Sequence, residues 1–136
     1  MSKVILCATD GTAHAEKAVG YAAELTKAFN GTLVLLAVRP FSLGRGGPTP
    51  LWDPKRAAEA LATGAKHARD AGVTAVETTE ADSPDVVDAI LVVAREKHAE
   101  QIVVGSGGKG GLQRALIGSV SSGVVHKAHV PVTVVH

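Results

Sequence analysis

Aromatic side chains are scarce in this chain of 136 residues: Phe, Trp and Tyr together make up 3% of it. Hydrophobic residues nevertheless reach 46%, so the core has to be built from Val, Leu, Ile and Ala. Aliphatic residues of this kind fill the buried strands of parallel sheets that helices cover. The length suits one compact core, so residues 1–136 are expected to form a single domain.

Cysteine and long hydrophobic runs are also nearly absent. Cys7 is the one cysteine, so no disulfide can form within the chain, and a reducing compartment is the simpler interpretation. Its place inside an apolar run favours an inert core thiol. The apolar stretch near the N-terminus is too short for a signal peptide, and no run approaches membrane-spanning length. We therefore expect a cytoplasmic protein without a membrane partner.

Acidic residues are missing from the last part of the chain. No Asp or Glu follows Glu100, whereas Lys109, Arg114 and Lys127 give this segment a formal charge of +3. The first hundred residues carry the other eleven basic and all thirteen acidic residues, a formal −2. The C-terminal segment would therefore repel an anion only weakly. The net charge of the whole chain is +1, which gives no reason to expect a nucleic acid as partner.

What the sequence does contain is an alternation of apolar strands and amphipathic helices. Strands are predicted at residues 4–8, 32–38, 73–79, 102–104 and 130–135, with a helical pattern between each pair of neighbours. Such alternation gives parallel strands joined by right-handed crossovers. The expected fold is α/β and Rossmann-like: an open sheet of five parallel strands in the order 3-2-1-4-5, with helices on both faces.

Capping residues predict where the helices begin and end. Thr12 and Ser119 are expected N-caps, and Ser83 is a third, because a proline follows it at the first helical position. Asn30 and Gly31 accept the left-handed conformation that ends the first helix. Residues 40–54 interrupt the pattern with four prolines and three glycines, which predicts a long exposed loop. A functional lid and a disordered insert remain equal alternatives for that loop.

The most informative stretch is the glycine-rich loop after the fourth strand. Five of the seven residues from Gly105 to Gly111 are glycine, and a further glycine, Gly118, precedes the last helical pattern. Glycine lets a backbone come close to a ligand, and the amides at a helix N-terminus attract anions. The loop therefore predicts a phosphate-binding site. Ligands of open parallel sheets bind at the carboxyl ends of the strands, so Asp10 and Val38 are expected beside it.

Two well-known phosphate-loop patterns do not explain this loop. Gly105–Gly110 satisfies the G-x-G-x-x-G spacing of dinucleotide-binding folds, but the acidic residue expected about twenty positions later is missing. The Walker pattern fails because Lys109 is followed by glycine rather than by Ser or Thr.

The pattern that does match is G-x2-G-x9-G-[ST], formed by Gly105, Gly108, Gly118 and Ser119. On these residues, and on the stretches at both ends of the chain, the sequence resembles the universal stress protein family, specifically its ATP-binding branch. A purely structural alternative remains open, in which the loop is a glycine-rich connector that binds nothing.

The resemblance implies a ligand and a set of binding residues. The ligand would be ATP, or ADP or AMP, together with Mg²⁺, and Asp10 would lie beside the ribose or the metal-bearing phosphates. Val38 would contact adenine, and Gly105 and Ser106 would border the ribose and the α-phosphate. The phosphate chain would be held by Gly108, Lys109, Gly118, Ser119 and Val120, and Ala8, Thr9 and Ser121 complete the expected ATP-binding set.

The last strand is expected to lie at a sheet edge, because it ends the chain and is apolar at most positions. Members of the resembled family dimerise through this strand. The resemblance thus implies a homodimer with Val130, Val132 and Val134 at its interface.

Taken together, these expectations describe a small dimeric ATP-binding regulatory module of the stress response, with an unidentified protein partner. Two alternatives stay open. One is a slow ATPase or phosphotransferase, for which Asp10, His14 and Ser121 are the candidate residues. The other is a nucleotide-free dimeric interaction protein.

Overall fold

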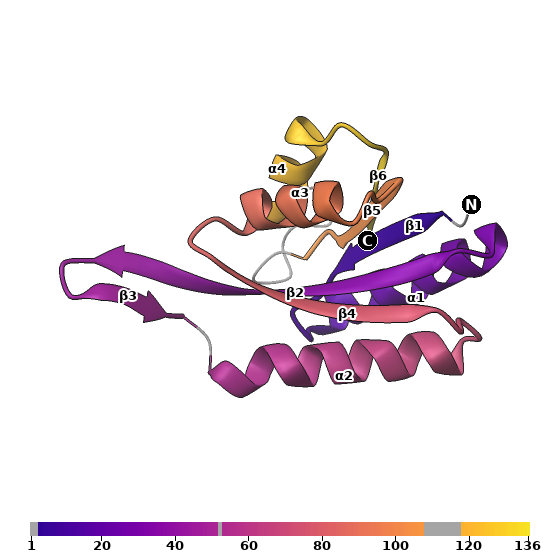
Figure 1. Ribbon diagram of the computed structural model, residues 1–136, viewed down its shortest axis with the longest axis horizontal. Coiled ribbons are helices and arrows are strands. Elements are labelled where there is room, and N and C mark those ends of the chain that lie inside the picture. The colour runs from indigo at the N-terminus through magenta and orange to yellow at the C-terminus, as the bar shows by residue number, and fades with distance from the viewer. Residues whose placement is uncertain (1–2, 52, 108–117) are drawn as a thin grey trace.

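Strand β1 (Val4–Ala8) lies at the centre of the sheet and pairs in parallel with β2 (Thr32–Gly44) and β5 (Gln101–Gly105). β4 (Val76–Ser83) pairs in parallel with β2, and β6 (Val132–Val135) pairs in parallel with β5. The parallel strands therefore lie in the predicted order (Figure 1). The structure is a computed structural model, and it describes residues 3–51, 53–107 and 118–136.

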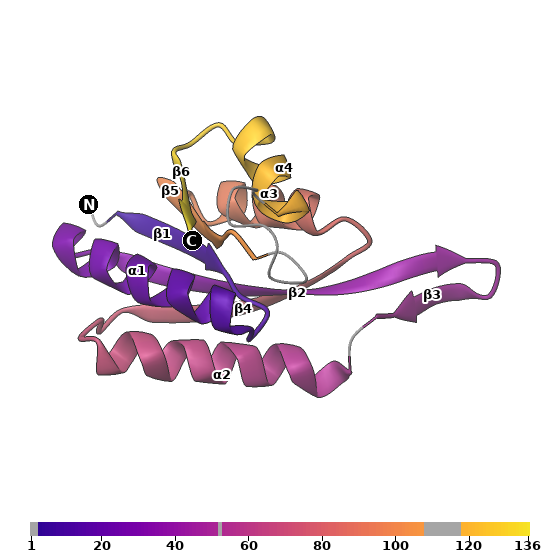
Figure 2. The ribbon, with the colours of Figure 1, turned by 180° about the vertical axis from the view of Figure 1, so that it is seen from behind.

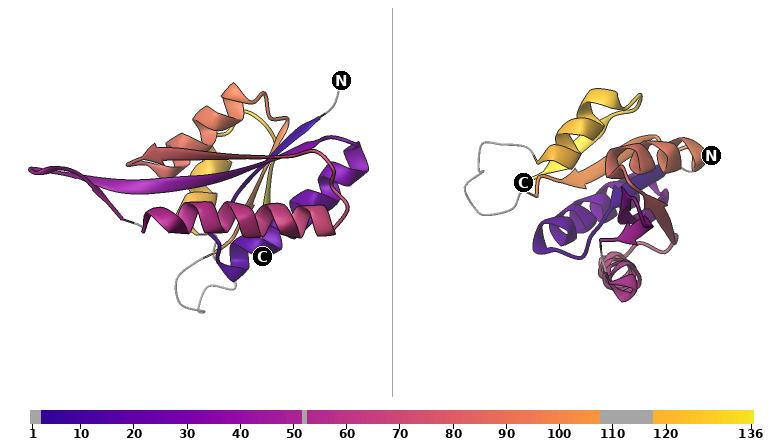
Figure 3. Two further views of the ribbon diagram at one scale, coloured as in Figure 1. Left: turned by 60° about the horizontal axis from the view of Figure 1, so that its bottom comes forward. Right: turned by 90° about the vertical axis from the view of Figure 1, so that its left-hand side faces the viewer.

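Helices cover both faces of the sheet, as predicted (Figures 2 and 3). Because side chains alternate along a strand, Leu33 and Leu35 of β2 pack on one face with α1 (Ala13–Phe29) and α2 (Pro54–Asp70). Val34 and Leu36 pack on the other face with α3 (Val86–Glu96) and α4 (Ser119–Lys127). The α/β class is thus confirmed, with one aliphatic core on each side of the sheet.

Helix α1 begins and ends as predicted. The Thr12 side chain accepts a hydrogen bond from the Ala15 amide at 3.3 Å, and Asn30 ends the helix in the left-handed conformation with φ 53°. Gly31 serves a different purpose, since a β-carbon there would lie 2.2 Å from the carbonyl oxygen of Lys3. The chain passes close to the start of β1 as it enters β2, and only a residue without a side chain fits at this position.

The prediction of Ser83 as an N-cap was wrong. Ser83 belongs to β4, where its register partner is Pro40, so its backbone is still extended. Its hydroxyl donates to the Asp85 carbonyl at 2.8 Å and accepts from the Asp85 amide at 3.1 Å. Asp85 caps α3 instead, and its carboxylate accepts from the Asp88 amide at 3.1 Å.

Two strand boundaries also differ from the prediction. The third parallel strand runs from Val76 to Ser83 rather than over residues 73–79, because β2 is long enough to pair with it as far as Pro40. Val73 is buried in the core after α2. The last strand starts at Val132 rather than at residue 130.

The prediction of a long loop over residues 40–54 was wrong as well. β2 continues to Gly44, and β3 (Gly47–Pro50) returns antiparallel to it. Gly47 has a φ of 97°, which a tight turn requires and other residues rarely adopt. We call residues 40–51 the arm, because this hairpin projects beyond the rest of the sheet (Figures 1 and 3).

No helix among the described residues is both long enough and apolar enough to cross a membrane.

Candidate functional site

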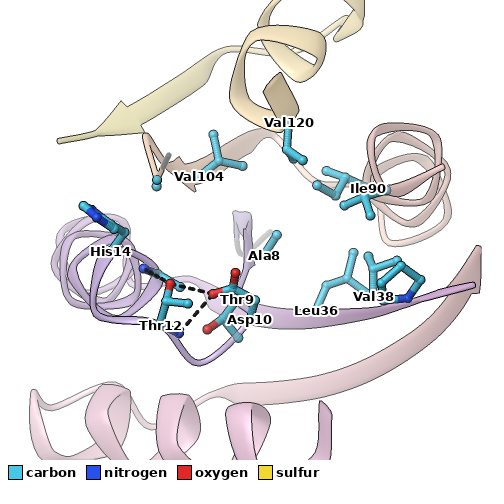
Figure 4. A pocket seen from close by; sticks show the side chains of 15 residues that line it. Ala8, Thr9, Asp10, Thr12, His14, Leu36, Val38, Ile90, Val104 and Val120 are labelled. Carbon is cyan, nitrogen blue, oxygen red and sulfur yellow. Dashed lines mark hydrogen bonds between the residues drawn. The ribbon is translucent and has the colours of Figure 1, made fainter. Parts of the chain in front are cut away.

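A pocket of about 280 Å³ opens at the carboxyl ends of β1 and β5, beside the middle of β2. Figure 4 shows Val104, Val120 and Ile90 on one side of it and Ala8, Leu36 and Val38 on the other. These side chains continue the aliphatic core that α3 and α4 cover. The core thus opens at the end of the sheet into an apolar slot.

The rim of the slot is polar and comes from the turn between β1 and α1. Asp10 Oδ1 accepts two hydrogen bonds from Thr12, from the amide at 3.0 Å and from the hydroxyl at 2.6 Å. The Thr9 hydroxyl oxygen accepts from the Gly11 amide at 3.2 Å. Gly11 has a φ of 82°, and a β-carbon there would lie 3.3 Å from Ala60 of α2. The turn therefore holds the Asp10 carboxylate at the pocket in one orientation.

The backbone of Val38 faces an opening in the sheet. On the β1 side of β2, the Leu36 carbonyl accepts from the Thr9 amide at 2.8 Å, and the Pro40 carbonyl accepts from the Leu51 amide at 3.0 Å. Val38 lies between them and points its N–H and C=O to the same side, because these groups alternate along a strand. The β1–β2 register ends at Leu36, and the β2–β3 register begins at Phe41. A donor and an acceptor are thus presented together at the pocket.

The loop after β5 is tied to the sheet and to α4 by backbone bonds. The Ser106 amide donates to Val135 of β6 at 2.8 Å, and the Gly118 amide donates to the Ser106 carbonyl at 3.0 Å. A β-carbon on Gly118 would lie 2.4 Å from the carbonyl oxygen of Gly107. Gly118 is therefore required by the close approach of two chain segments, whatever binds nearby.

The start of α4 differs from the predicted capping. Gly118 rather than Ser119 is its N-cap, and no side chain caps this end of the helix. The prediction was wrong because Gly118 already has the extended backbone of a cap, with φ −64° and ψ 162°, so that Ser119 is the first helical residue. The first amides of a helix have no acceptor within it, so this end remains able to receive an anion.

The structure brings part of the predicted binding set to the pocket. Its lining includes Ala8, Thr9, Asp10, Val38, Gly105 and Val120. Ser106, Gly118, Ser119 and Ser121 lie at the junction of the loop with α4 and do not line it. Ser121 is 2% exposed, and its hydroxyl donates to the Gly118 carbonyl at 3.0 Å. Gly108 and Lys109 lie outside the described residues.

Several lining residues were not predicted, chiefly Leu36, Val86, Ile90 and Val104. A sequence signal existed for the strand residues: Leu36 shares a strand face with Val38, two positions later. Nothing in the sequence indicated which face α3 would cover, and this decides the place of Ile90. His14, one of the candidate residues for phosphate transfer, also lines the pocket, and a β-carbon on Gly107 would lie 3.3 Å from the His14 β-carbon.

The buried thiol considered from the sequence does not add chemistry to the pocket. Burial, together with the nearby Glu16 carboxylate, raises the pKa of the Cys7 thiol, so it stays protonated in the core on the α1 side. Within the described part of the chain, no group of three His, Cys, Asp or Glu side chains is placed to hold a metal ion.

A comparison with known proteins places this chain in a family. The profile of the universal stress protein family matches residues 1–136. The chain belongs to the universal stress protein family. The resemblance inferred from the sequence is thereby confirmed.

Individual members of the family resemble the chain over nearly all of its length. Universal stress protein MJ0531 of Methanocaldococcus jannaschii is 33% identical over 140 residues, which cover 98% of this chain and 81% of that protein. A solved universal stress protein of Archaeoglobus fulgidus superimposes with a TM-score of 0.80 at 25% identity, covering 100% of this chain and 95% of the other. A universal stress protein solved in complex with cAMP gives 0.78 at 25% identity, covering 98% and 96%.

Proposed function

We propose that this universal stress protein binds an adenine nucleotide, with ATP and Mg²⁺ as the expected physiological form, and acts as a dimeric regulatory module of the stress response. The observation that carries the proposal is the apolar slot at the end of the sheet, with the open backbone of Val38 on one side and the start of α4 on the other.

The slot suits a purine base. Its walls are the aliphatic side chains of Leu36, Val38, Ile90 and Val104, between which a flat aromatic ring can pack. An N–H and a C=O from one residue match the neighbouring acceptor and donor on the edge of adenine, N1 and N6. Guanine presents a donor at N1 and an acceptor at O6, the reverse order. The backbone of Val38 therefore favours adenine when it reads that edge.

The volume supports a nucleoside rather than a larger group inside the slot. Pockets for small ligands usually measure roughly 300–1,000 Å³, and this one, at about 280 Å³, has room for a base with its sugar. The ribose would lie toward Asp10, whose carboxylate is held by Thr12 and can accept hydrogen bonds from sugar hydroxyls.

The phosphates would then extend toward the start of α4. Val120 of its first turn lines the slot, and the cap Gly118 contributes no side chain. Amides at such a helix end donate to phosphate oxygens, and the helix dipole favours their negative charge. In the proposed complex Gly105, Ser106, Gly108, Lys109, Gly118, Ser119, Val120 and Ser121 surround the sugar and the phosphates.

Mg²⁺ fits this arrangement only as a companion of the nucleotide. Asp10 is the one carboxylate among the described residues that line the pocket, and one carboxylate with several waters and phosphate oxygens is a usual set for this ion. The ion would supply charge neutralisation between phosphate oxygens. Among the described residues of the lining, the chain would contribute one carboxylate ligand at most.

A relative supports the choice of ligand class. The universal stress protein solved with cAMP shares the fold over nearly the whole chain and binds an adenine nucleotide. The remaining part of the proposal, a homodimer through β6 with Val130, Val132 and Val134 at its interface, is supported by the position of β6, which pairs with β5 and ends the order of strands.

Isothermal titration calorimetry tests the proposal directly. We expect ATP, ADP, AMP and cAMP to bind, GTP to bind at least tenfold more weakly, and Mg²⁺ to strengthen the binding of ATP. Absence of heat and of thermal stabilisation with every adenine nucleotide, with and without Mg²⁺, would overturn it. Incubation with γ-labelled ATP separates a binding protein from a slow ATPase, because only the ATPase releases labelled phosphate.

A further inference from the structure

We infer that the arm is a self-association surface: the apolar faces of two arms from two copies of the chain pack antiparallel, with Arg45 of each over the acidic base of the other. The residues that decide this lie on one face of the hairpin. Figures 1 and 3 show that the arm projects away from the helices, so this face is not covered along its outer part.

One face of the arm is apolar from end to end. The antiparallel register pairs Phe41 with Pro50 and Leu43 with Pro48. Directly opposed residues share a face, and so do alternate residues of a strand, so these four side chains lie together. Ser42 and Thr49, another register pair, lie on the opposite face. Leu43 is 70% exposed, the largest exposed fraction of any large hydrophobic side chain among the described residues.

A two-stranded hairpin without further packing is at best marginally stable in water. The arm nevertheless extends four residue pairs past the end of the sheet, from Phe41–Pro50 to Gly44–Gly47. An exposed apolar face on such an element indicates that another surface covers it.

The outer edge of β3 is closed to an added strand. The Leu51 amide donates inward to Pro40, so the residues at the alternate positions, Pro48 and Pro50, have their nitrogens on the outer side. Proline has no N–H, and these positions offer no donor to a further strand. Association through the outer edge of β3 is therefore disfavoured.

The base of the same face carries a negative charge. Arg39 and Asp82 are register partners, and Arg39 has the same strand parity as Phe41 and Leu43. Arg39 Nε lies 2.7 Å from Asp82 Oδ1 and 3.4 Å from Glu80 Oε1. One guanidinium between two carboxylates leaves a formal charge of −1, and the Asp82 side chain is 58% exposed.

The tip carries the opposite charge. Arg45 is the one charged residue of the arm and lies in the turn between β2 and β3. At a rise of about 3.4 Å per residue, the tip is roughly 20 Å from Arg39. The face therefore runs from a negative base over an apolar middle to a positive tip. Such a pattern is complementary to itself when two copies pack antiparallel about a two-fold axis.

This surface is separate from β6, which lies at the other end of the strand order. Four side chains per copy bury less than the roughly 800 Å² per partner of a standard interface, so we expect weak, concentration-dependent association. The arm contact would double the mass of whatever unit exists without it, a monomer or a β6-linked dimer.

Sedimentation velocity over a concentration series up to the millimolar range tests the inference. Leu43→Ser removes an apolar side chain from both sides of the two-fold contact and should weaken association on the order of a hundredfold. Leu51→Ser is the matched control: the same residue type on the same hairpin, 60% exposed, but with the strand parity of Thr49. It should leave association at the wild-type level, and both variants should keep the wild-type circular dichroism and melting temperature.

Charge reversal tests the antiparallel arrangement. Arg45→Glu should weaken association, more strongly at low salt than at high salt, and Asp82→Arg added to it should restore part of the loss. A wild-type mass that stays constant over the series, or equal losses in Leu43→Ser and Leu51→Ser, would overturn the inference. So would sedimentation with phosphatidylglycerol vesicles that depends on Leu43 while the mass of the protein in solution stays constant, because the face would then serve a lipid surface.

Discussion

Helices α3 and α4 pack side by side on one face of the sheet, and each begins at the pocket. Their N-termini are capped differently. At α3 the Asp85 carboxylate accepts from the Asp88 amide, so the end is closed by the chain itself. At α4 the cap is Gly118, without a side-chain bond. Asp85 also places a negative charge at its helix end, whereas no acidic residue lies in the first turn of α4. One helix start is built for stability, and the other is left available to an anion.

The largest effect on ATP affinity is expected from placing a carboxylate at the start of α4, where α3 has Asp85. Ser119 is exposed at the first position of α4, so Ser119→Asp is sterically tolerated. The added carboxylate also interacts favourably with the helix dipole, so the variant should fold. A carboxylate beside the phosphates should cost about 3 kcal/mol of binding free energy, on the order of a hundredfold in ATP affinity. Calorimetry measures the affinity and differential scanning fluorimetry the stability.

Ser119→Ala is the control for that variant and should retain ATP binding within a few-fold. An aspartate variant that binds ATP as tightly as wild type would show that phosphates do not lie at this helix end. Loss of affinity together with a lowered melting temperature would instead indicate damage to the fold.

A second variant tests whether α4 must be held against α3. A β-carbon on Gly123 of α4 would lie 2.7 Å from a methyl group of Val87 of α3. Gly123→Ala should therefore push α4 away, destabilise the protein by roughly 1–2 kcal/mol and weaken ATP binding several-fold. Adding Val87→Ala should recover both quantities, as measured by urea unfolding and calorimetry. Failure of the double variant to recover would place the strain elsewhere.

A smaller effect is expected from the polar rim. Thr12→Ala removes the cap of α1 and one of the two hydrogen bonds that hold the Asp10 carboxylate. The amide bond to Asp10 can persist, whereas the 2.6 Å hydroxyl bond cannot. We expect a loss of about 1 kcal/mol in the free energy of unfolding and a two- to fivefold loss of ATP affinity. Thr12→Ser, which keeps the hydroxyl, should restore both. Restored stability without restored affinity would separate the cap from the pocket.

The smallest effect on binding is expected at the capped helix. Asp85→Ala should cost about 1 kcal/mol of stability, because the Asp88 amide loses its acceptor. It should leave ATP affinity unchanged within twofold, since Asp85 does not line the pocket. Urea unfolding and calorimetry on the same sample measure both. A large gain or loss in ATP affinity would contradict the proposal that the start of α4, and not that of α3, receives the phosphates.

Much of the fold was predictable because it depends on local patterns. The apolar run of β1, the cap at Thr12 and the left-handed Asn30 are each decided by a few neighbouring residues, and each was confirmed. The errors occurred where a distant segment decides the outcome. Ser83 stays in a strand because β2 extends to pair with it, and the proline-rich segment forms an arm because its own turn brings β3 back onto β2.

In the pocket, too, some features depend on neighbouring residues and others on distant segments of the chain. Gly105, Gly118 and the aspartate after β1 were visible as binding candidates in the sequence. The structural role of Gly118 was not visible in the sequence. A β-carbon added at this position would meet the Gly107 carbonyl, and that contact depends on how the two ends of a loop come together. Helix α3 contributes Ile90 to the wall only because of the sheet face on which it packs.

The sequence by itself determined the order of the parallel strands and helices, the aliphatic character of the core and the family, because periodicity, glycine spacing and capping act within short stretches. Only the tertiary structure decided that Val38 presents a free donor and acceptor, because this depends on where β1 stops and where β3 returns. Apart from proline, every residue carries the same backbone N–H and C=O. Whether these groups are free therefore depends on which strands pair with them, and those strands come from elsewhere in the chain.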